Sequence, residues 1–207
     1  TAEMIKLSEN RFRDVKIAFA NEISLICSKY EIDVREVIKL ANKHPRVNIL
    51  DSGIGVGGHC IPVDPWFLID NKKNTKLLKT ARNVNNDKTL FIIREIKKNI
   101  IKYKKKFKKI PSISLLGLTY KKDVNDIRNS PSLKIFNNLY KEYQKIYLVD
   151  PFIKTYKNHS IYSANFAIKN SQIIIILINH SVFKKLLTKN NLKNKIIIDY
   201  CNINIKS

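Results

Sequence analysis

The amino-acid sequence predicts an α/β protein in two parts: an all-helical part over residues 1–109 and an α/β part over residues 110–207. Two observations predict this division. Before Lys109 the apolar residues recur at helical spacing in segments of helical length. After Pro111 short, isoleucine-rich runs alternate with helical segments, which is typical of a parallel sheet covered on both faces. The second part is therefore expected to be Rossmann-like.

Three helices are expected in the first part. The segment from Ala2 to about Lys29 contains no glycine or proline, and its apolar spacing predicts a long, largely buried helix. Asp33 followed by Glu36 has the capping-box pattern of a second helix, which Pro45 ends. A third helix from about Thr75 to Lys106 would span ~45 Å, long enough to connect two lobes or to pair with a partner. The apolar positions of the first helix are Ile5, Phe12, Val15, Phe19, Ile23 and Ile26.

In the second part, four apolar runs predict strands: SISLLGL, which Gly117 stops, then KIYLVD, SQIIIILIN and KIIIDY. Ser130 as N-cap and Pro131 in the first turn predict a helix between the first two strands. The segment HSVFKKLL predicts another helix before the last strand.

The chain carries 39 basic and 17 acidic residues, a net charge of +22. Such a charge is compatible with a nucleic-acid binder, which would show steeply salt-dependent DNA retention. We favour a compositional bias, because lysine, isoleucine and asparagine are abundant in every segment, and we expect no specific nucleic-acid partner. No apolar run approaches about 18 residues, so no membrane span is predicted. The three cysteines form no CxxC pair, which argues against a disulfide framework or a metal site and suits a reducing cytoplasm.

The segment GIGVGGHCIPVDPWF raises the question of a dinucleotide loop, because Gly53, Gly55 and Gly58 match G-x-G-x-x-G. That fingerprint requires a strand before the glycines and a helix after them. Here a helix precedes the segment, and Pro62 and Pro65 are expected to prevent a regular helix after it. We therefore interpret the segment as a tight loop in which bare backbone approaches a ligand.

The same loop presents Cys60. A free cysteine is often a small buried apolar residue. The flanking glycines and prolines favour instead a reactive thiol near the titratable groups His59 and Asp64. His59 is either an activating base or an exposed loop residue. On the first helix, Glu3, Lys6, Asn10 and Arg13 are expected to share one face, which by itself could be a solvated surface.

Three stretches carry a resemblance to a known family: AEMIKLSENRFRDVKIAFANEI, GVGGHCIPVDPWFL and LLGLTYKKDVNDIRNSPSLKI. Together, in this order, they resemble the UDP-glucose/GDP-mannose dehydrogenase family. The similarity spans nearly the whole chain as that family's central dimerisation domain, here 1–109, and its C-terminal UDP-binding domain, here 110–207.

The resemblance implies a two-step, NAD-dependent oxidation of a sugar-nucleotide primary alcohol to a carboxylate, serving polysaccharide biosynthesis. Cys60 would be the nucleophile that forms a thiohemiacetal and then a thioester. Lys6 would be an acid/base that stabilises oxyanions together with Asn10, and Asp64 would orient the hydrolytic water. Arg128 would reach the cofactor. The residues implied to hold a UDP-N-acetyl-hexosamine substrate are Arg13, His44, Arg46, Gly57, Tyr120 and Lys121.

The family also has an N-terminal NAD-binding domain of roughly 200 residues, an ordinary domain size, that these 207 residues do not include. We expect this domain to lie outside the sequence. Ile205 stands where the family tends to have an arginine after its last strand. A homodimer through the third helix is also implied. A non-catalytic module that only binds UDP-sugar or dimerises is the alternative.

Overall fold

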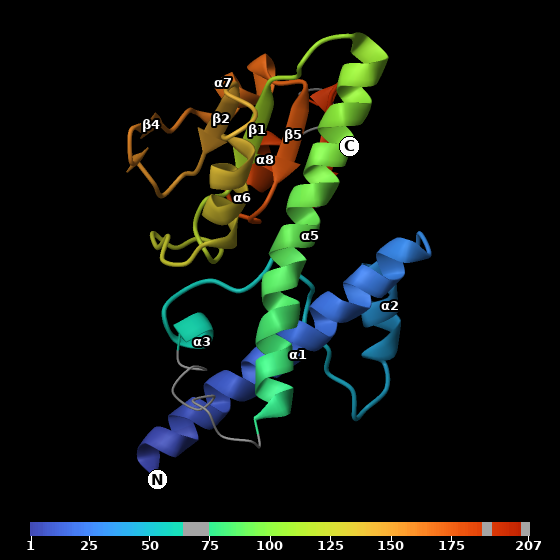
Figure 1. Cartoon of the computed structure of the whole chain (residues 1–207), viewed down its shortest axis with the longest axis vertical. Helices are drawn as coiled ribbons and strands as arrows, with labels where there is room; N and C mark the ends of the chain where they lie inside the picture. The colour runs from blue at the N-terminus through green and yellow to red at the C-terminus, as the bar shows by residue number, and fades with distance from the viewer. Residues whose placement is uncertain (64–74, 188–191, 204–207) are drawn as a thin grey trace. The chain divides into compact units, whose positions relative to one another are not determined.

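A computed structural model describes residues 1–63, 75–187 and 192–203. The chain divides into two compact units, Thr1–Leu90 and Phe91–Ser207 (Figure 1). One long helix, α5 (Lys76–Phe107), contributes residues to both units and confirms the predicted third helix. Among the described residues, no helix is long and apolar enough to cross a membrane.

The first unit consists of helices and loops. Helix α1 (Ala2–Lys29) has the predicted bounds, and it contacts both α2 (Val34–Ala41) and the one-turn helix α3 (Cys60–Val63). Asp33 caps α2 as predicted, with its carboxylate accepting a hydrogen bond from the backbone of the residue two positions later.

Helix α2 ends earlier than predicted. Its last residue is Ala41 and its C-cap is Asn42, so Pro45 lies beyond the end and does not terminate the helix. The Asn42 side chain instead holds the following turn, since its Oδ1 accepts from the backbone N–H of Ile49 and its Nδ2 donates to the Ile49 carbonyl.

The prediction that α1 is buried through its apolar residues is wrong. Phe12 and Phe19 are 65% and 50% exposed, and Ile5 and Ile26 are exposed as well. The physical reason is that the inner face of α1 is largely polar and is satisfied by hydrogen bonds and ion pairs. The buried residues of α1 are Asn10, Arg11, Asp14, Ala18, Ala20, Asn21, Ser24 and Cys27.

The second unit contains a parallel four-stranded sheet of order β2-β1-β5-β6. Its strands are β1 (Ile113–Leu116), β2 (Ile146–Val149), β5 (Ile173–Ile176) and β6 (Ile196–Asp199), which confirms the four predicted strands. In the sheet, Ile113 pairs with Ile146 on one side and Ile173 on the other, and Ile173 pairs with Ile196.

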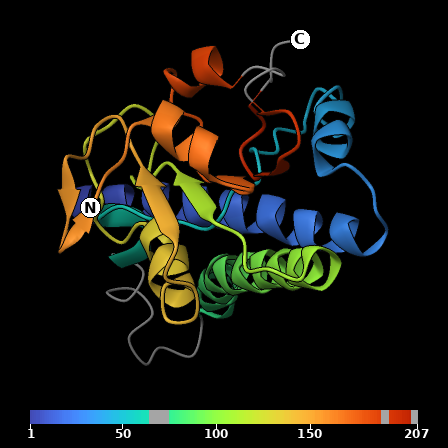
Figure 2. The same cartoon turned by 90° about the horizontal axis from the view of Figure 1, so that it is seen from above.

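Helices cover both faces of this sheet. Figure 2 shows α6 (Pro131–Leu139) on one face, and α7 (Ala164–Asn170) and α8 (Phe183–Leu186) on the other. Ser130 is the N-cap residue of α6 and Pro131 occupies the first turn, as predicted, but the Ser130 hydroxyl donates to the Leu118 carbonyl and makes no capping hydrogen bond to the helix. Helix α7 and the small antiparallel pair β3 (Thr155–Tyr156) and β4 (His159–Ser160) were not predicted.

Gly117 ends β1 as predicted, and the structure shows why a glycine is needed. Its φ is +92°, and a Cβ atom there would lie 2.5 Å from Cβ of Ile178. The loops after β1 and β5 can therefore approach each other at the carboxyl edge of the sheet, where ligands of open α/β sheets usually bind.

Candidate functional site

Cys60 is the first residue of α3, and its thiol side chain is exposed. The expectation that prolines would exclude a helix here is corrected, because α3 contains Pro62 in its only turn, where a missing N–H costs no intrahelical hydrogen bond. Because α3 packs against α1, the thiol lies on the element that contacts the helix carrying Lys6 and Asn10. Asp64 lies outside the described residues.

The glycine segment before α3 is irregular backbone. Gly55 and Gly58 have φ of 135° and 92°, values that favour glycine. Gly57 is half-buried between them, and the residues from Val47 to His59 form no strand. The strand–loop–helix context of a dinucleotide site is therefore missing here.

Two polar side chains fix the start of this segment. The Gly53 N–H donates to Oδ1 of Asn21 on α1 at 2.9 Å. The Ile54 carbonyl accepts from the Thr89 hydroxyl on α5 at 2.8 Å. Both side chains are buried, so the loop leading toward the thiol is tied to two helices of its own unit.

Behind Asn21 lies a buried polar network that sequence reasoning missed. Nδ2 of Asn21 donates to Asn85 Oδ1 at 2.8 Å, and Nδ2 of Asn85 donates to the Asp14 carboxylate at 2.7 Å. Arg82 is 3.1 Å from the same carboxylate. A signal existed, because Asn10, Asp14 and Asn21 recur at helical spacing on α1.

Burial controls the charges in this network. Burial raises the pKa of Asp14 and outweighs the opposing influence of Arg82, the hydrogen bond from Asn85 and the charge of Arg11. Burial also lowers the pKa of Arg82, against the attraction of Asp14. Such a group of buried ions is costly to leave incomplete, so its members are expected to depend on one another.

Four polar residues were expected to share one face of α1, and the three of them that are candidate site residues differ in environment. Lys6 is exposed, with its Nζ 3.3 Å from Glu9 Oε2. Asn10 is buried and Arg13 is exposed. The exposed stripe expected from their spacing therefore includes Lys6 and Arg13, while Asn10 faces the interior of the unit.

His44 and Arg46 lie in the turn after α2, and both are exposed. The Arg46 N–H donates to Nδ1 of His44 at 3.2 Å, which sets the local shape of the turn and leaves the Arg46 side chain at the surface.

In the second unit, Tyr120 and Lys121 lie in the loop after β1, where Tyr120 is half-buried and Lys121 is exposed. The Tyr120 N–H donates to the Asp126 carbonyl at 3.0 Å. The Arg128 guanidinium makes two-sided contacts with the Asp126 carboxylate, the shortest at 2.7 Å. Arg128 and Lys154 line a pocket of about 600 Å³ between the loops after β1 and β2.

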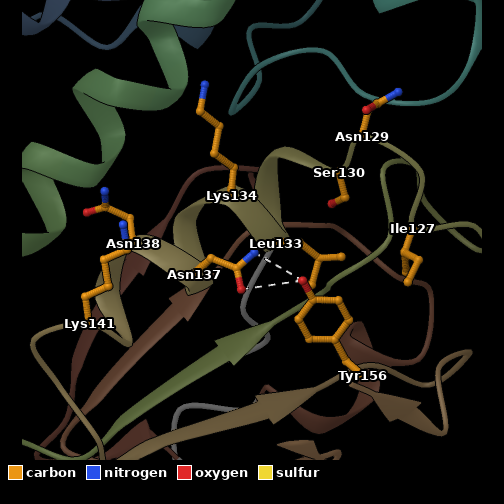
Figure 3. Close-up of a pocket in the computed structure, with 9 residues that line it drawn as sticks. All are labelled: Ile127, Asn129, Ser130, Leu133, Lys134, Asn137, Asn138, Lys141 and Tyr156. Atoms are coloured by element: carbon orange, nitrogen blue, oxygen red, sulfur yellow. Dashed lines mark hydrogen bonds between the residues drawn. The ribbon is translucent and has the colours of Figure 1, made fainter. Parts of the chain in front are cut away.

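A second pocket, of about 540 Å³, lies along α6 (Figure 3). Figure 3 shows the hydroxyl of Tyr156 directed at Asn137, and the amide Nδ2 of Asn137 donates to it at 3.1 Å. Lys134 of α6 and Lys141, which follows this helix, line the same pocket and give it two cationic side chains. Ile127 lines both pockets.

Two family models match the chain. The model described as UDP-glucose/GDP-mannose dehydrogenase family, central domain, matches residues 1–87. The model described as the UDP binding domain of the same family matches residues 114–205.

The chain is also similar to named relatives. It is 45% identical to the UDP-N-acetyl-D-mannosamine dehydrogenase of Methanocaldococcus jannaschii, over 98% of this chain and 47% of that protein. It is 46% identical to the Campylobacter jejuni protein of the same name, over 88% of this chain and 46% of the relative. The solved structure of UDP-D-ManNAc dehydrogenase from Pyrococcus horikoshii has a TM-score of 0.84 and 38% identity, over 98% of this chain and 48% of that one. The chain thus spans about half the length of these relatives.

Proposed function

The chain belongs to the UDP-glucose/GDP-mannose dehydrogenase family, and we propose that it is the thiol-bearing and UDP-sugar-binding part of a UDP-N-acetyl-D-mannosamine dehydrogenase. The single observation that carries this proposal is the 45% identity to such an enzyme over 98% of this chain. The exposed thiol of Cys60, on a helix that packs against α1, supports it.

In this proposal the reaction converts UDP-N-acetyl-D-mannosamine to its C6 carboxylate. The Cys60 thiolate attacks the carbonyl carbon of the C6 aldehyde, forming a C–S bond and placing negative charge on oxygen. That aldehyde would arise when the C6 alcohol gives up a proton and a first hydride, and the thiohemiacetal oxyanion would become a thioester by giving up a second hydride; a bound nicotinamide cofactor would accept both hydrides. Water then adds to the thioester carbon, the C–S bond breaks, and the thiolate is released with the carboxylate product.

Lys6 and Asn10 are proposed to stabilise the oxyanion by donating hydrogen bonds, and Lys6 also to move the proton. Donors of this kind typically contribute about 3 kcal/mol each to lowering a barrier. In the structure Lys6 is paired with Glu9 and its side chain is exposed, so the ion pair can be replaced by a contact with a ligand. Asp64 is proposed to orient the hydrolytic water.

The nucleotide part of the substrate is proposed to bind to exposed cations. Lys121 belongs to the second unit, which matches the family's UDP-binding domain, and Arg13 and Arg46 belong to the first. Arg128, also in the second unit, is proposed to contact the cofactor and not the substrate. Arginine suits a pyrophosphate because its guanidinium can donate two parallel hydrogen bonds. His44, Gly57 and Tyr120 complete the proposed contacts.

NAD is the proposed hydride acceptor, but the described residues do not fit it. The glycines at Gly53–Gly58 follow no strand, and β1 is followed by one glycine, Gly117, whose surroundings are filled by Ile178. We therefore propose that NAD binds to a part of the complete protein outside this chain. The three free cysteines support a reducing compartment such as the cytoplasm.

Replacing the thiol tests this proposal in the full-length protein. Cys60→Ser should retain UDP-sugar binding while carboxylate formation falls by about a thousandfold or more, because the nucleophile is lost. Cys201→Ser, which removes a thiol from the second unit, is the matched control and should keep its activity. Retained carboxylate formation in Cys60→Ser would refute the assigned role.

Substrate choice needs its own comparison. We expect UDP-N-acetyl-D-mannosamine to be oxidised faster than UDP-N-acetyl-D-glucosamine, the alternative substrate. Equal turnover of the two epimers contradicts the proposed preference. Binding of UDP-sugar with no oxidation of either, in the presence of NAD, would favour a non-catalytic binding module.

A further inference from the structure

A buried histidine lies at the carboxyl edge of the sheet, beside the loop that carries Tyr120 and Lys121. His180 follows β5 and is 0% exposed. Its ring is held between the rings of Phe152 and Phe183, with centroids 5.2 and 5.4 Å away.

Both ring nitrogens of His180 have defined roles. The backbone N–H of Asp123 points at Nδ1 from 3.0 Å, so Nδ1 must accept. In the neutral ring the proton is then on Nε2, which lies 3.2 Å from Asp150 Oδ2 and 3.3 Å from the Thr119 hydroxyl. The Thr119 hydroxyl donates to the carbonyl of Lys121 at 2.8 Å, which leaves its oxygen able to accept from Nε2.

Asp150, directly after β2, anchors the other end of this arrangement. Its Oδ2 accepts from the backbone N–H groups of Leu118 and Thr119 at 2.6 and 3.2 Å. Its Oδ1 accepts from the N–H of Phe152 at 2.9 Å. One carboxylate therefore ties the loops after β1 and β2 together and orients His180.

Asp123 fixes the other end of the loop that carries Tyr120 and Lys121. Its carboxylate accepts from the backbone N–H of Ser181 at 2.8 Å and from the Ser181 hydroxyl at 2.6 Å. Its backbone has φ of 54°, a left-handed value that bends the chain back toward β5. Tyr120 and Lys121 thus lie between two residues, Thr119 and Asp123, that are both fixed to buried groups.

We propose that His180 is a positioning residue of the nucleotide-sugar site, which fixes the loop 118–123 so that Tyr120 and Lys121 are preorganised for the UDP group. The inference rests on the proposed function of the second unit. Preorganisation increases affinity because the loop does not have to be ordered when the ligand binds. His180 itself is buried, so its proposed effect on the ligand is exerted through the loop.

Two substitutions of His180 each preserve a different one of the hydrogen bonds that its ring makes with Asp123 and Asp150. The amide oxygen of Asn lies as many bonds from Cα as Nδ1 does, so His180→Asn can still accept from Asp123. The amide nitrogen of Gln corresponds to Nε2, so His180→Gln can still donate to Asp150 but leaves the Asp123 N–H without an acceptor. A role in loop positioning therefore predicts a larger defect for Gln than for Asn.

The test is calorimetric titration of the 207-residue chain with UDP, together with thermal unfolding and hydrogen exchange of residues 118–123. His180→Gln should bind UDP about tenfold more weakly, with faster exchange in this loop, and His180→Asn should stay within about threefold of wild type. His159→Gln, the same change at a histidine of β4, is the control and should bind UDP as wild type does.

If His180→Gln does not fold, Ser181→Ala tests the same loop. Ser181 is exposed, so this substitution is expected to leave the protein folded. It removes a hydrogen bond to Asp123 and should also weaken UDP binding and loosen the loop. Wild-type UDP affinity in both His180→Gln and Ser181→Ala refutes the positioning role of His180 but leaves the proposed function of the second unit in place. A wild-type chain that fails to bind UDP at millimolar concentration refutes the proposed function of this unit as well.

Discussion

At the scale of single residues, the fold of the first unit depends on polar side chains that are fully buried. Asn21 and Asn85 are 0% and 1% exposed, and their amide orientations are set by Asp14, because an ionised carboxylate can only accept. Asn85 must present Nδ2 to Asp14 and Oδ1 to Asn21. Asn21 must then present Oδ1 to the Gly53 N–H. One charge thus determines how the glycine loop is held.

Removing the middle amide should disconnect this chain of hydrogen bonds. We expect Asn85→Ala to lower the free energy of unfolding by about 2–3 kcal/mol, because it removes the hydrogen bonds that Asn85 makes with the buried Asp14 carboxylate and with Nδ2 of Asn21. Urea unfolding measures this. Asn86→Ala, at the exposed neighbouring position of α5, should change the stability by less than about 0.5 kcal/mol. Equal effects of the two substitutions would show that the network contributes nothing specific.

At the scale of secondary-structure elements, the exposed face of α1 is unusual. Ile5, Phe12, Phe19 and Ile26 recur every seven residues and are 46–65% exposed. A seven-residue apolar repeat is the pattern by which one helix packs along another. The exposed apolar residues of α5 have irregular spacing, and they are Leu77, Leu90, Ile101 and Phe107. Helix α1 is therefore a second candidate dimerisation surface, in addition to α5, which is the helix that the sequence suggests.

Lysine substitutions on the exposed apolar residues of α1 or of α5 test which of these two helices forms the dimer interface. If the protein is a homodimer through α1, Phe12→Lys combined with Phe19→Lys should make it monomeric, because the paired charges would be buried at the interface. Ile101→Lys on α5 should leave the dimer intact. Sedimentation velocity measures the mass in solution. A monomer formed only by Ile101→Lys would place the interface on α5 and reject α1.

At the scale of the whole molecule, one buried carboxylate in each unit has a shifted pKa, and the two shifts have opposite directions. Burial acts to raise the pKa of Asp150, but hydrogen bonds from His180, Leu118 and Phe152 outweigh it and leave the pKa below its ordinary value. Such a group stabilises the fold above its unfolded pKa and loses this effect as the pH falls. Asp14 in the first unit has a raised pKa, so its cost to stability is relieved on acidification.

The acid response of the second unit should depend on Asp150. Asp150→Asn is expected to cost about 2 kcal/mol of unfolding free energy at neutral pH, because charge-assisted hydrogen bonds are lost. The difference from wild type should shrink below pH 3.8, the ordinary pKa, as the wild-type carboxylate is protonated through its lower folded pKa. Urea unfolding across this range measures the difference. A difference that does not change with pH contradicts the assignment.

The sequence by itself determined the elements and their order, because hydrophobic periodicity is local. The helix expected from Ala2 to about Lys29 is α1, the four predicted strands form the sheet, and Gly117 ends a strand as predicted. The sequence also determined the family, since the matching stretches cover both parts of the chain. Candidate site residues such as Cys60 could be identified from the sequence motif, but the burial and the hydrogen-bond partners of these residues could not be predicted from it.

Only the tertiary structure decided which face of α1 is buried. Periodicity treats an apolar residue as internal, whereas here Asp14 and Asn21 are internal because residues distant in sequence, Arg82 and Asn85, satisfy them. The same holds for His180, whose partners lie 30 to 61 residues away along the chain. Hydrogen bonds between distant segments have no local signature, and they hold the loops in which the candidate site residues lie.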